Sequence, residues 1–325
     1  VSYYSGKKSI HNNSRHIVEN LDQLPFPDRS LLKRDLYSSP KLGEKPWTVM
    51  LTSRGCSHRC IYCVPNSLSF ARELEFKSKS KGKPPVRVRD AEQVIEEFRQ
   101  LARDGYKAIS IIDDQFVWGK ERTLKICEAI AGLSIKWGCL SRADHLDDEI
   151  LKAMAKAGCK YIDIGVESFN QNVLDYVKKD LDVEAIYNKI ALIKKHGIDV
   201  KLNMLLGACP TESKQSIRDS ISKAIALKPS NIMFSVVCPF PGTEFYEECQ
   251  KNGWLKNSTY NPIDVQKEAI TNFPGMSSQE LDVMVKKANY RFFFSPRFVL
   301  SNAKKLASTR SLSTVAKAIK RKLTF

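Results

Sequence analysis

The middle of this chain alternates between short apolar segments and longer amphipathic ones, which restricts the folds open to it. The apolar segments, rich in β-branched residues, are residues 48–52, 108–112, 136–140, 161–166, 200–206 and 232–237. Such segments are typical of strands buried on both faces of a sheet. Six strand–helix units in succession predict an α/β domain with a parallel sheet. Periodicity alone leaves open whether that sheet is doubly wound or part of a barrel.

The helices between these strands have recognisable boundaries. The clearest one begins after Asp90, a good N-cap residue, and places Val94 and Phe98 on one face. The others are predicted at residues 121–131, 147–157, 184–196, 211–227 and 244–252. Gly158 and Gly197 stand where two of these helices should end.

Three cysteines, Cys56, Cys60 and Cys63, directly follow the first predicted strand. Their C-x-x-x-C-x-x-C spacing offers three thiolates to a metal centre. A 4Fe–4S cluster held by four cysteines transfers electrons, whereas a cluster held by three keeps one iron open to a small molecule. A zinc site is the alternative, with His58 as the fourth ligand. Zinc ligands usually come as two pairs, and no second pair follows here.

The other six cysteines are scattered singly through apolar segments: Cys127, Cys139, Cys159, Cys209, Cys238 and Cys249. We expect most of them to be small core residues. The odd total of nine cysteines and the lack of a secretory signal argue against a disulfide framework. They favour a reducing, cytoplasmic compartment. No apolar run approaches the roughly 20 residues needed to cross a bilayer.

The cysteine motif, with Tyr62 before its last cysteine, resembles that of the radical S-adenosylmethionine (SAM) enzymes. The resemblance implies a 4Fe–4S cluster and SAM as cofactors, and reductive cleavage of SAM to a 5′-deoxyadenosyl radical. It also implies an electron donor such as a flavodoxin or a ferredoxin. These enzymes use a six-unit partial (β/α) barrel, which decides the fold question. Chemistry in barrels gathers at the carboxyl ends of the strands, where the cysteine loop is expected.

The resemblance covers roughly residues 45–255 and implies SAM contacts at the ends of the predicted strands. Tyr62 matches the aromatic position beside the adenine. Asp113 and Asp114 match the segment that contacts the amino group of the methionine moiety. A carboxylate is a strong acceptor for a cationic amine. A turn or a helix cap is the alternative role for this pair.

Arg142 ends the third predicted strand and could bind the methionine carboxylate through a bidentate fork. A salt bridge to Asp144 or Glu167 is the alternative. We expect Glu167 to face a polar cavity, because a carboxylate inside a barrel is costly unless it is paired. The further SAM contacts that the resemblance implies are Glu167, Ser168, Asn203, Pro239 and Phe240. No residue is assigned a catalytic role beyond the cluster ligands.

The flanking segments resemble the cobalamin-associated branch of these enzymes. That branch includes anaerobic magnesium-protoporphyrin cyclase-like enzymes, hopanoid-modifying enzymes and C-methyltransferases. Residues 1–45 resemble the tail of a cobalamin-binding domain and the linker that follows it; the domain itself is absent from this chain. Within them, residues 1–18 resemble the tail, with a strand pair that ends the domain. We expect residues 46–255 to form the radical SAM core and residues 256–325 a helical carboxyl-terminal extension. Cobalamin is allowed as a third cofactor but can be assigned to no residue.

Lysine and arginine number 52 against 36 acidic residues, a net charge of +16 that favours anionic partners. Part of the excess lies in residues 77–83 and 301–325. The tail at residues 303–325 has the pattern of a basic amphipathic helix, which suits peripheral contact with an anionic membrane. A tail that packs on the core or stays solvated is the alternative.

The sequence therefore predicts an enzyme that cleaves SAM to start methyl transfer, cyclisation or rearrangement on a small molecule. A lipid or another hydrophobic compound would suit the basic tail. One alternative is an RNA-modifying radical SAM enzyme, favoured only by the net charge. The accessory domains of such enzymes are not seen, so we expect no nucleic-acid partner. A non-catalytic, zinc-bearing interaction module is the other alternative.

Overall fold

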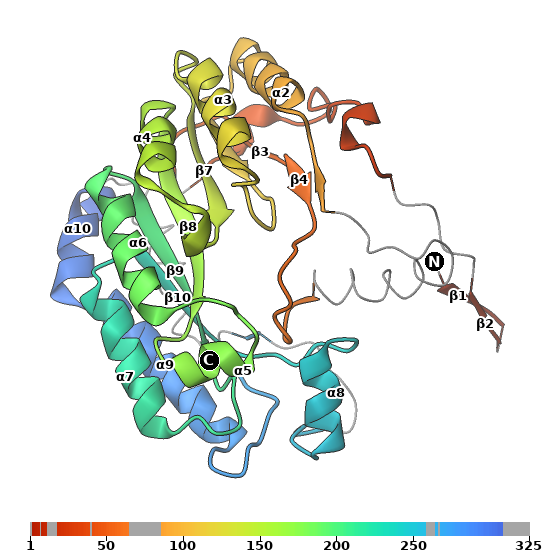
Figure 1. Cartoon of the computed structure of the whole chain (residues 1–325), viewed down its shortest axis with the longest axis vertical. Coiled ribbons are helices and arrows are strands. Elements are labelled where there is room, and N and C mark those ends of the chain that lie inside the picture. The colour runs from red at the N-terminus through yellow and green to blue at the C-terminus, as the bar shows by residue number, and fades with distance from the viewer. Residues whose placement is uncertain are drawn as a thin grey trace.

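The computed structural model describes residues 2–6, 8–11, 18–39, 41–64, 86–257, 264–265 and 267–307. Its central sheet has six parallel strands (Figure 1): β3 (Trp47–Met50), β6 (Ala108–Ile111), β7 (Lys136–Ser141), β8 (Cys159–Glu167), β9 (Asp199–Leu206) and β10 (Asn231–Val236). The strands stand side by side in chain order, with β3 and β10 at the two edges. In a doubly wound sheet, by contrast, the strand order begins near the centre, runs to one edge and then reverses towards the other edge. The predicted six-unit partial barrel is therefore confirmed.

The helices cover one face of this sheet: α2 (Ala91–Arg103), α3 (Lys120–Ile130), α4 (Asp148–Lys156), α6 (Val183–Lys195) and α7 (Lys214–Ala226). Alternate strand residues such as Ile109, Trp137 and Ile162 pack with these helices in one buried core. Because side chains alternate along a strand, the intervening residues point to the opposite side. We call that side of the sheet the open face.

Capping residues explain why the element boundaries lie close to the predicted ones. Gly158 and Gly197 follow α4 and α6 with φ of +89° and +71°, a conformation that glycine adopts without strain. Asp147 and Asp182 accept hydrogen bonds from backbone N–H groups in the first turns of the same helices. Asp90 is a correction, because it precedes α2 but its side chain makes no capping hydrogen bond.

Smaller elements surround the sheet. They are the antiparallel pairs β1 (Ser2–Ser5) with β2 (Lys8–His11) and β4 (Ser53–Arg54) with β5 (Arg87–Val88), the helices α5 (Gln171–Tyr176), α8 (Glu244–Lys251), α9 (Ser278–Phe293) and α10 (Pro296–Ala307), and the 3₁₀ turns η1 (Leu21–Gln23), η2 (Arg34–Leu36) and η3 (Ala143–His145). The strand pair expected near the amino terminus is present as β1 and β2. Helix α9 shares the main core through Leu281 and Val285, so the predicted extension packs on the sheet domain. The proposed domain boundaries stay a prediction.

Two basic features predicted from the sequence lie outside the described residues: residues 77–83 and the amphipathic tail beyond residue 307. Within the described ranges, no helix combines the length and the apolar character required to span a membrane. The six scattered cysteines are all buried, as predicted for core residues.

A buried carboxylate connects the segment before β3 to the sheet domain. We call this segment, residues 18–39 and 41–46, the linker. The Glu97 side chain on α2 is only 2% exposed and binds Arg29 of the linker at 2.8 Å and Arg89 at 2.5 Å. Arg29 also donates a hydrogen bond to the carbonyl of Val49 in β3, and Arg89 donates one to the carbonyl of Leu51. Linker, first strand and first helix therefore meet at one ionic group.

Replacing this carboxylate should destabilise the protein far more than replacing its neighbour. Glu97→Gln leaves Arg29 at a buried site without its counter-charge and Arg89 with only the more distant Asp22, at 3.9 Å. The substitution should lower the free energy of unfolding by about 3 kcal/mol or more. Glu96→Gln is the matched control, because Glu96 pairs with Arg103 in solvent and exposed pairs contribute less than about 1 kcal/mol. Urea unfolding measures both values. Equal effects of the two substitutions would contradict the role given to Glu97.

Candidate cofactor site

The cysteine-bearing loop, residues 55–64, runs from the β3 edge of the sheet towards the opposite edge. It leaves β4 beside β3 and runs towards α5 and α8 (Figure 1). The backbone N–H of Ile61 donates to the carbonyl of Val177 and the Ile61 carbonyl accepts from Phe245, both at 3.1 Å. The Ile61 side chain is buried in a second apolar cluster with Val173 and Phe245. The middle of the loop is therefore fixed to the elements that follow β8 and β10.

Asp113, directly after β6, fixes the start of the loop. Its buried carboxylate accepts from the Thr52 N–H at 2.6 Å and from the hydroxyls of Thr52 and Ser53 at 2.5 and 2.9 Å. Burial raises the pKa of Asp113, although these hydrogen bonds act in the opposite direction. Asp114 is exposed and accepts from the Gly55 N–H at 3.1 Å. Gly55 has a φ of +99°, so this turn requires glycine.

The three thiols of the loop lie in a partly buried setting. Cys60 is buried, and Cys56 and Cys63 are half-buried. Burial is the main reason that the pKa of Cys60 is raised, while the nearby positive charge of Lys179 acts to lower it. Three thiols on one loop, with a cation close by, are a donor set that fits an iron–sulfur cluster.

The structure does not place His58 as a fourth zinc ligand beside these cysteines. Among the described residues, the one trio of His, Cys, Asp or Glu donor atoms within 4.8 Å of one another is His58, Asp144 and His145. Zinc–sulfur bonds of about 2.3 Å would hold the sulfurs of one ion about 3.8 Å apart. The three cysteines are therefore not gathered around a single ion. The sulfur ligands of a cluster bind different irons and lie farther apart.

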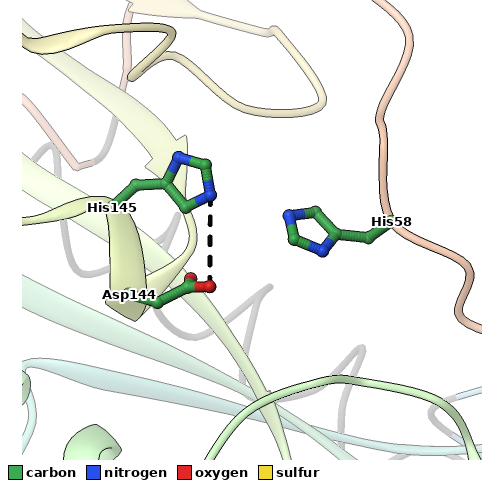
Figure 2. Close-up of side chains that lie close together, drawn as sticks. All are labelled: His58, Asp144 and His145. Atoms are coloured by element: carbon green, nitrogen blue, oxygen red, sulfur yellow. Dashed lines mark ion pairs between the residues drawn. The ribbon is translucent and has the colours of Figure 1, made fainter.

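The trio instead packs the cysteine loop against the end of β7. Figure 2 shows His58 pointing from the loop towards Asp144 and His145. The two imidazole rings meet edge to face, with 5.7 Å between their centroids. Burial lowers the pKa of His58 to about 4, so its ring is neutral. His145 Nδ1 lies 2.8 Å from Gln115 Nε2. Asp144 is already bound to Arg142 through both oxygens, so we assign the trio to holding the loop.

Arg142 is engaged within the protein, which favours the salt-bridge alternative left open by the sequence. Its two hydrogen bonds to Asp144 are 3.1 Å long. It also donates to the carbonyls of Lys179 and Asp180 at 2.8 Å. Four of the five guanidinium N–H donors are thus used. The geometry gives no support to Arg142 as a ligand of the methionine carboxylate.

Glu167 lies at a β-bulge at the end of β8, with a left-handed φ of +67°. Its carboxylate binds the buried Lys179 at 2.8 Å and also bonds the Tyr62 hydroxyl. Burial acts to lower the pKa of Lys179, but Glu167 outweighs it and the pKa is raised. A Cβ atom on Gly165 would lie 2.7 Å from a Glu167 oxygen, so this pair needs glycine beneath it. No sequence motif marks Lys179 as the partner.

The remaining predicted SAM contacts lie in different surroundings. The buried Ser168 hydroxyl lies 3.0 Å from the Ser220 hydroxyl on α7, so it packs against the helix layer. Asn203 lies on the open face of β9, and its Oδ1 is buried without a hydrogen-bond partner. Pro239 is buried and Phe240 is half-buried in the turn before α8. Of this group, Asn203 offers an unpaired acceptor to a polar ligand.

An open polar cleft adjoins the middle of the cysteine loop. Its volume is about 460 Å³, and its walls are Ser57, His58, Arg59, Asp175, Lys178 and Asp180. The first three residues belong to the loop and the others lie in or after α5. The loop can therefore be approached from solvent on this side.

Comparisons with known proteins agree with this geometry. The model of the Radical SAM superfamily matches residues 50–224, more than half of the chain. An uncharacterized methyltransferase of Pyrococcus horikoshii is 27% identical over 311 residues, which cover 93% of this chain and 62% of the relative. The anaerobic magnesium-protoporphyrin IX monomethyl ester cyclase of Cereibacter sphaeroides is 23% identical over 305 residues, which cover 90% of this chain and 46% of the relative.

Solved structures show the same fold. The apo form of the cobalamin-dependent S-adenosylmethionine radical enzyme OxsB is 16% identical, with a TM-score of 0.62 over 98% of this chain and 50% of that chain. The present chain therefore spans only about half the length of the proteins that it resembles.

The neighbouring aspartates after β6 should respond differently to the same substitution. Asp113→Asn places an amide against buried donors, and should lower the free energy of unfolding by about 1–3 kcal/mol because one donor is left unpaired. Asp114→Asn, the matched control, changes an exposed side chain with one hydrogen bond and should shift it by less than about 1 kcal/mol. Urea unfolding reports stability, and limited proteolysis within residues 55–64 reports the loop. Equal stability and equal cleavage in the two variants would show that Asp113 does not anchor the loop.

Proposed function

The chain belongs to the radical SAM superfamily, and from this membership we propose that it reductively cleaves SAM to start radical chemistry on a small-molecule substrate. The observation that carries the proposal is the three-cysteine loop, which is fixed at its start and at its middle at the carboxyl edge of a parallel sheet whose strands lie in chain order. The relatives include a methyltransferase and a cyclase, in agreement with the predicted cobalamin-associated branch. Methyl transfer, cyclisation or rearrangement is the proposed outcome.

The family implies a 4Fe–4S cluster and SAM as cofactors. When bound, a 4Fe–4S cluster with three cysteine ligands supplies the electron that splits SAM into methionine and a 5′-deoxyadenosyl radical. We propose Cys56, Cys60 and Cys63 as its ligands. The protein contributes the position of these thiols, because Asp113 fixes the start of the loop and Ile61 its middle.

The surroundings of each residue narrow the proposed SAM site. Asp114 is the better candidate for the amino group of SAM, because Asp113 is occupied by Thr52 and Ser53. Asp114 is exposed beside the loop and free to accept further hydrogen bonds. Tyr62, Glu167, Asn203, Pro239 and Phe240 stay in the proposed site. Arg142 and Ser168 serve as positioning residues, because Arg142 uses four of its five donors within the protein and Ser168 faces the helix layer.

Several finer assignments are also proposals. We propose a flavodoxin or a ferredoxin as the electron donor, a cytoplasmic location and peripheral membrane contact through residues 303–325. Cobalamin is proposed as a further cofactor of the protein, because OxsB, which has this fold, is described as cobalamin-dependent. No residue of this chain is assigned to it.

Alanine substitution of the loop cysteines tests the proposal directly. After anaerobic reconstitution, the wild-type chain should hold about four irons and about four sulfides. Cys56→Ala, Cys60→Ala and Cys63→Ala should each hold less than about a quarter of that iron, because a cluster left with two protein ligands is lost. Cys127→Ala is the control, since it removes a buried thiol in α3 outside the loop. Iron analysis and electron paramagnetic resonance of the reduced proteins, with and without SAM, are the measurements.

Two results would contradict the proposal. One is equal iron content in the loop variants and the Cys127→Ala control. The other is zinc without iron or sulfide after anaerobic purification, which would favour the zinc-bearing interaction module.

A further inference from the structure

The open face of the sheet is apolar over three neighbouring strands. Val49 in β3, Ile112 directly after β6 and Leu140 in β7 are 38%, 49% and 37% exposed. Each is adjacent in sequence to a residue that is buried in the helix-side core, so each points to the open face. Exposed apolar side chains gathered in this way mark a binding surface more often than scattered ones do.

The other half of the open face is polar. Asp163 in β8 is paired in register with Leu140 on one side and with Lys201 of β9 on the other. Asn203 and Ser235 follow on β9 and β10, and each has a buried oxygen without a hydrogen-bond partner. The boundary between the apolar and the polar half therefore runs between Leu140 and Asp163.

Asp163 is the most unusual residue on this face. It is 4% exposed, and its Oδ2 accepts from Lys41 at 2.5 Å and from Lys201 at 3.2 Å. Its Oδ1 is buried without any hydrogen-bond partner. A buried carboxylate oxygen normally has a donor, so this atom has an acceptor position to offer to a ligand that donates. Lys41 comes from the linker, and its Nζ lies 4.4 Å from the centroid of the Tyr161 ring.

A hydrogen-bonded floor closes the amino-terminal end of this face. The hydroxyl of Ser110 accepts from the Tyr161 hydroxyl at 2.8 Å and from Trp47 Nε1 at 2.9 Å. Leu42 of the linker packs on the same aromatic residues. Asp163 and Gly165 are successive open-face residues of β8, about 7 Å apart along the strand. Gly165 is in register with Asn203 of β9. It thus lies between the floor and the edge at which we place SAM.

We propose that the substrate is an uncharged amphipathic molecule whose apolar body lies on Val49, Ile112 and Leu140 and whose hydroxyl group donates to Asp163. This proposal rests on the proposed function and names the substrate class of the same site. A hydroxyl suits the position, because it can donate to Asp163 Oδ1 and accept from Lys41 or Lys201. A carboxylate has no proton to donate to Asp163 Oδ1, and a purely apolar molecule would leave this oxygen unpaired.

Simple probes of one chain length test the substrate class. We would titrate 1-octanol and octanoate into the 325-residue chain by ligand-observed NMR and compare dissociation constants. The wild-type chain should bind 1-octanol at least tenfold more tightly than octanoate. Leu140→Asp should weaken 1-octanol binding at least tenfold. Val283→Asp, which changes an apolar residue of α9 that is 48% exposed, should leave it within twofold.

Asp163→Asn should shift the preference towards octanoate, which is a sharper result than a loss of binding. Without the aspartate charge, Lys41 and Lys201 would attract an anion, so octanoate should bind at least tenfold more tightly than to the wild-type chain. Unchanged probe preference in Asp163→Asn, or equal affinity of the wild-type chain for both probes, would overturn the proposal. If Asp163→Asn does not fold, Ile112→Asp joins Leu140→Asp as the second test, and unchanged 1-octanol binding in both would overturn it.

The same samples separate this proposal from the proposed function. Iron content and the formation of 5′-deoxyadenosine from SAM are measured alongside the probe affinities. A wild-type chain without iron or SAM cleavage would contradict the proposed function, whereas the probe preferences alone judge the substrate class.

Discussion

The cysteine loop is held at its start and at its middle by hydrogen bonds to residues distant in sequence, and the geometry of the site depends on this. The first strand, β3, is at an edge of the sheet, so the loop that follows it has a neighbouring strand on one side only. Asp113 supplies one anchor and the backbone of Ile61 the other. Asp113 directly follows β6, and the partners of Ile61 lie in segments that follow β8 and β10. The loop therefore lies at the edge of the sheet where a parallel α/β fold gathers its functional groups. Loss of either anchor would free the thiols from their common setting.

The second constraint is the way in which charge is buried around the sheet. Glu97 joins the linker to α2, Glu167 and Lys179 lie beneath the loop, and Asp163 holds Lys41 and Lys201 on the open face. Buried ion pairs contribute little net stability compared with apolar packing, but breaking one of them is strongly unfavourable. In this protein they fix where the linker, the loop and the open face lie relative to one another. The linker is therefore part of the site, because Lys41 comes from it.

Local patterns in the sequence were enough to predict the strands and the helices, and they mark the three cysteines as the proposed cluster ligands. The apolar runs, the caps and the C-x-x-x-C-x-x-C spacing are all readable within a few residues. Contacts between residues distant in sequence could not be predicted from such patterns. Asp113 binds Thr52 and Ser53, about sixty residues away, and Arg142 binds the carbonyl of Lys179. Neither Lys179 nor Asp163 lies in a motif, since the need for each arises only when strands and loops meet in space.

Electron–nuclear double resonance on the reduced, reconstituted chain is the most direct test of the central claim, that three cysteines leave an iron open to SAM. SAM labelled with ¹⁵N in its amino group would be added to the wild-type chain. The account predicts a ¹⁵N hyperfine coupling to the cluster. A reduced cluster that shows no such coupling at saturating SAM would contradict it.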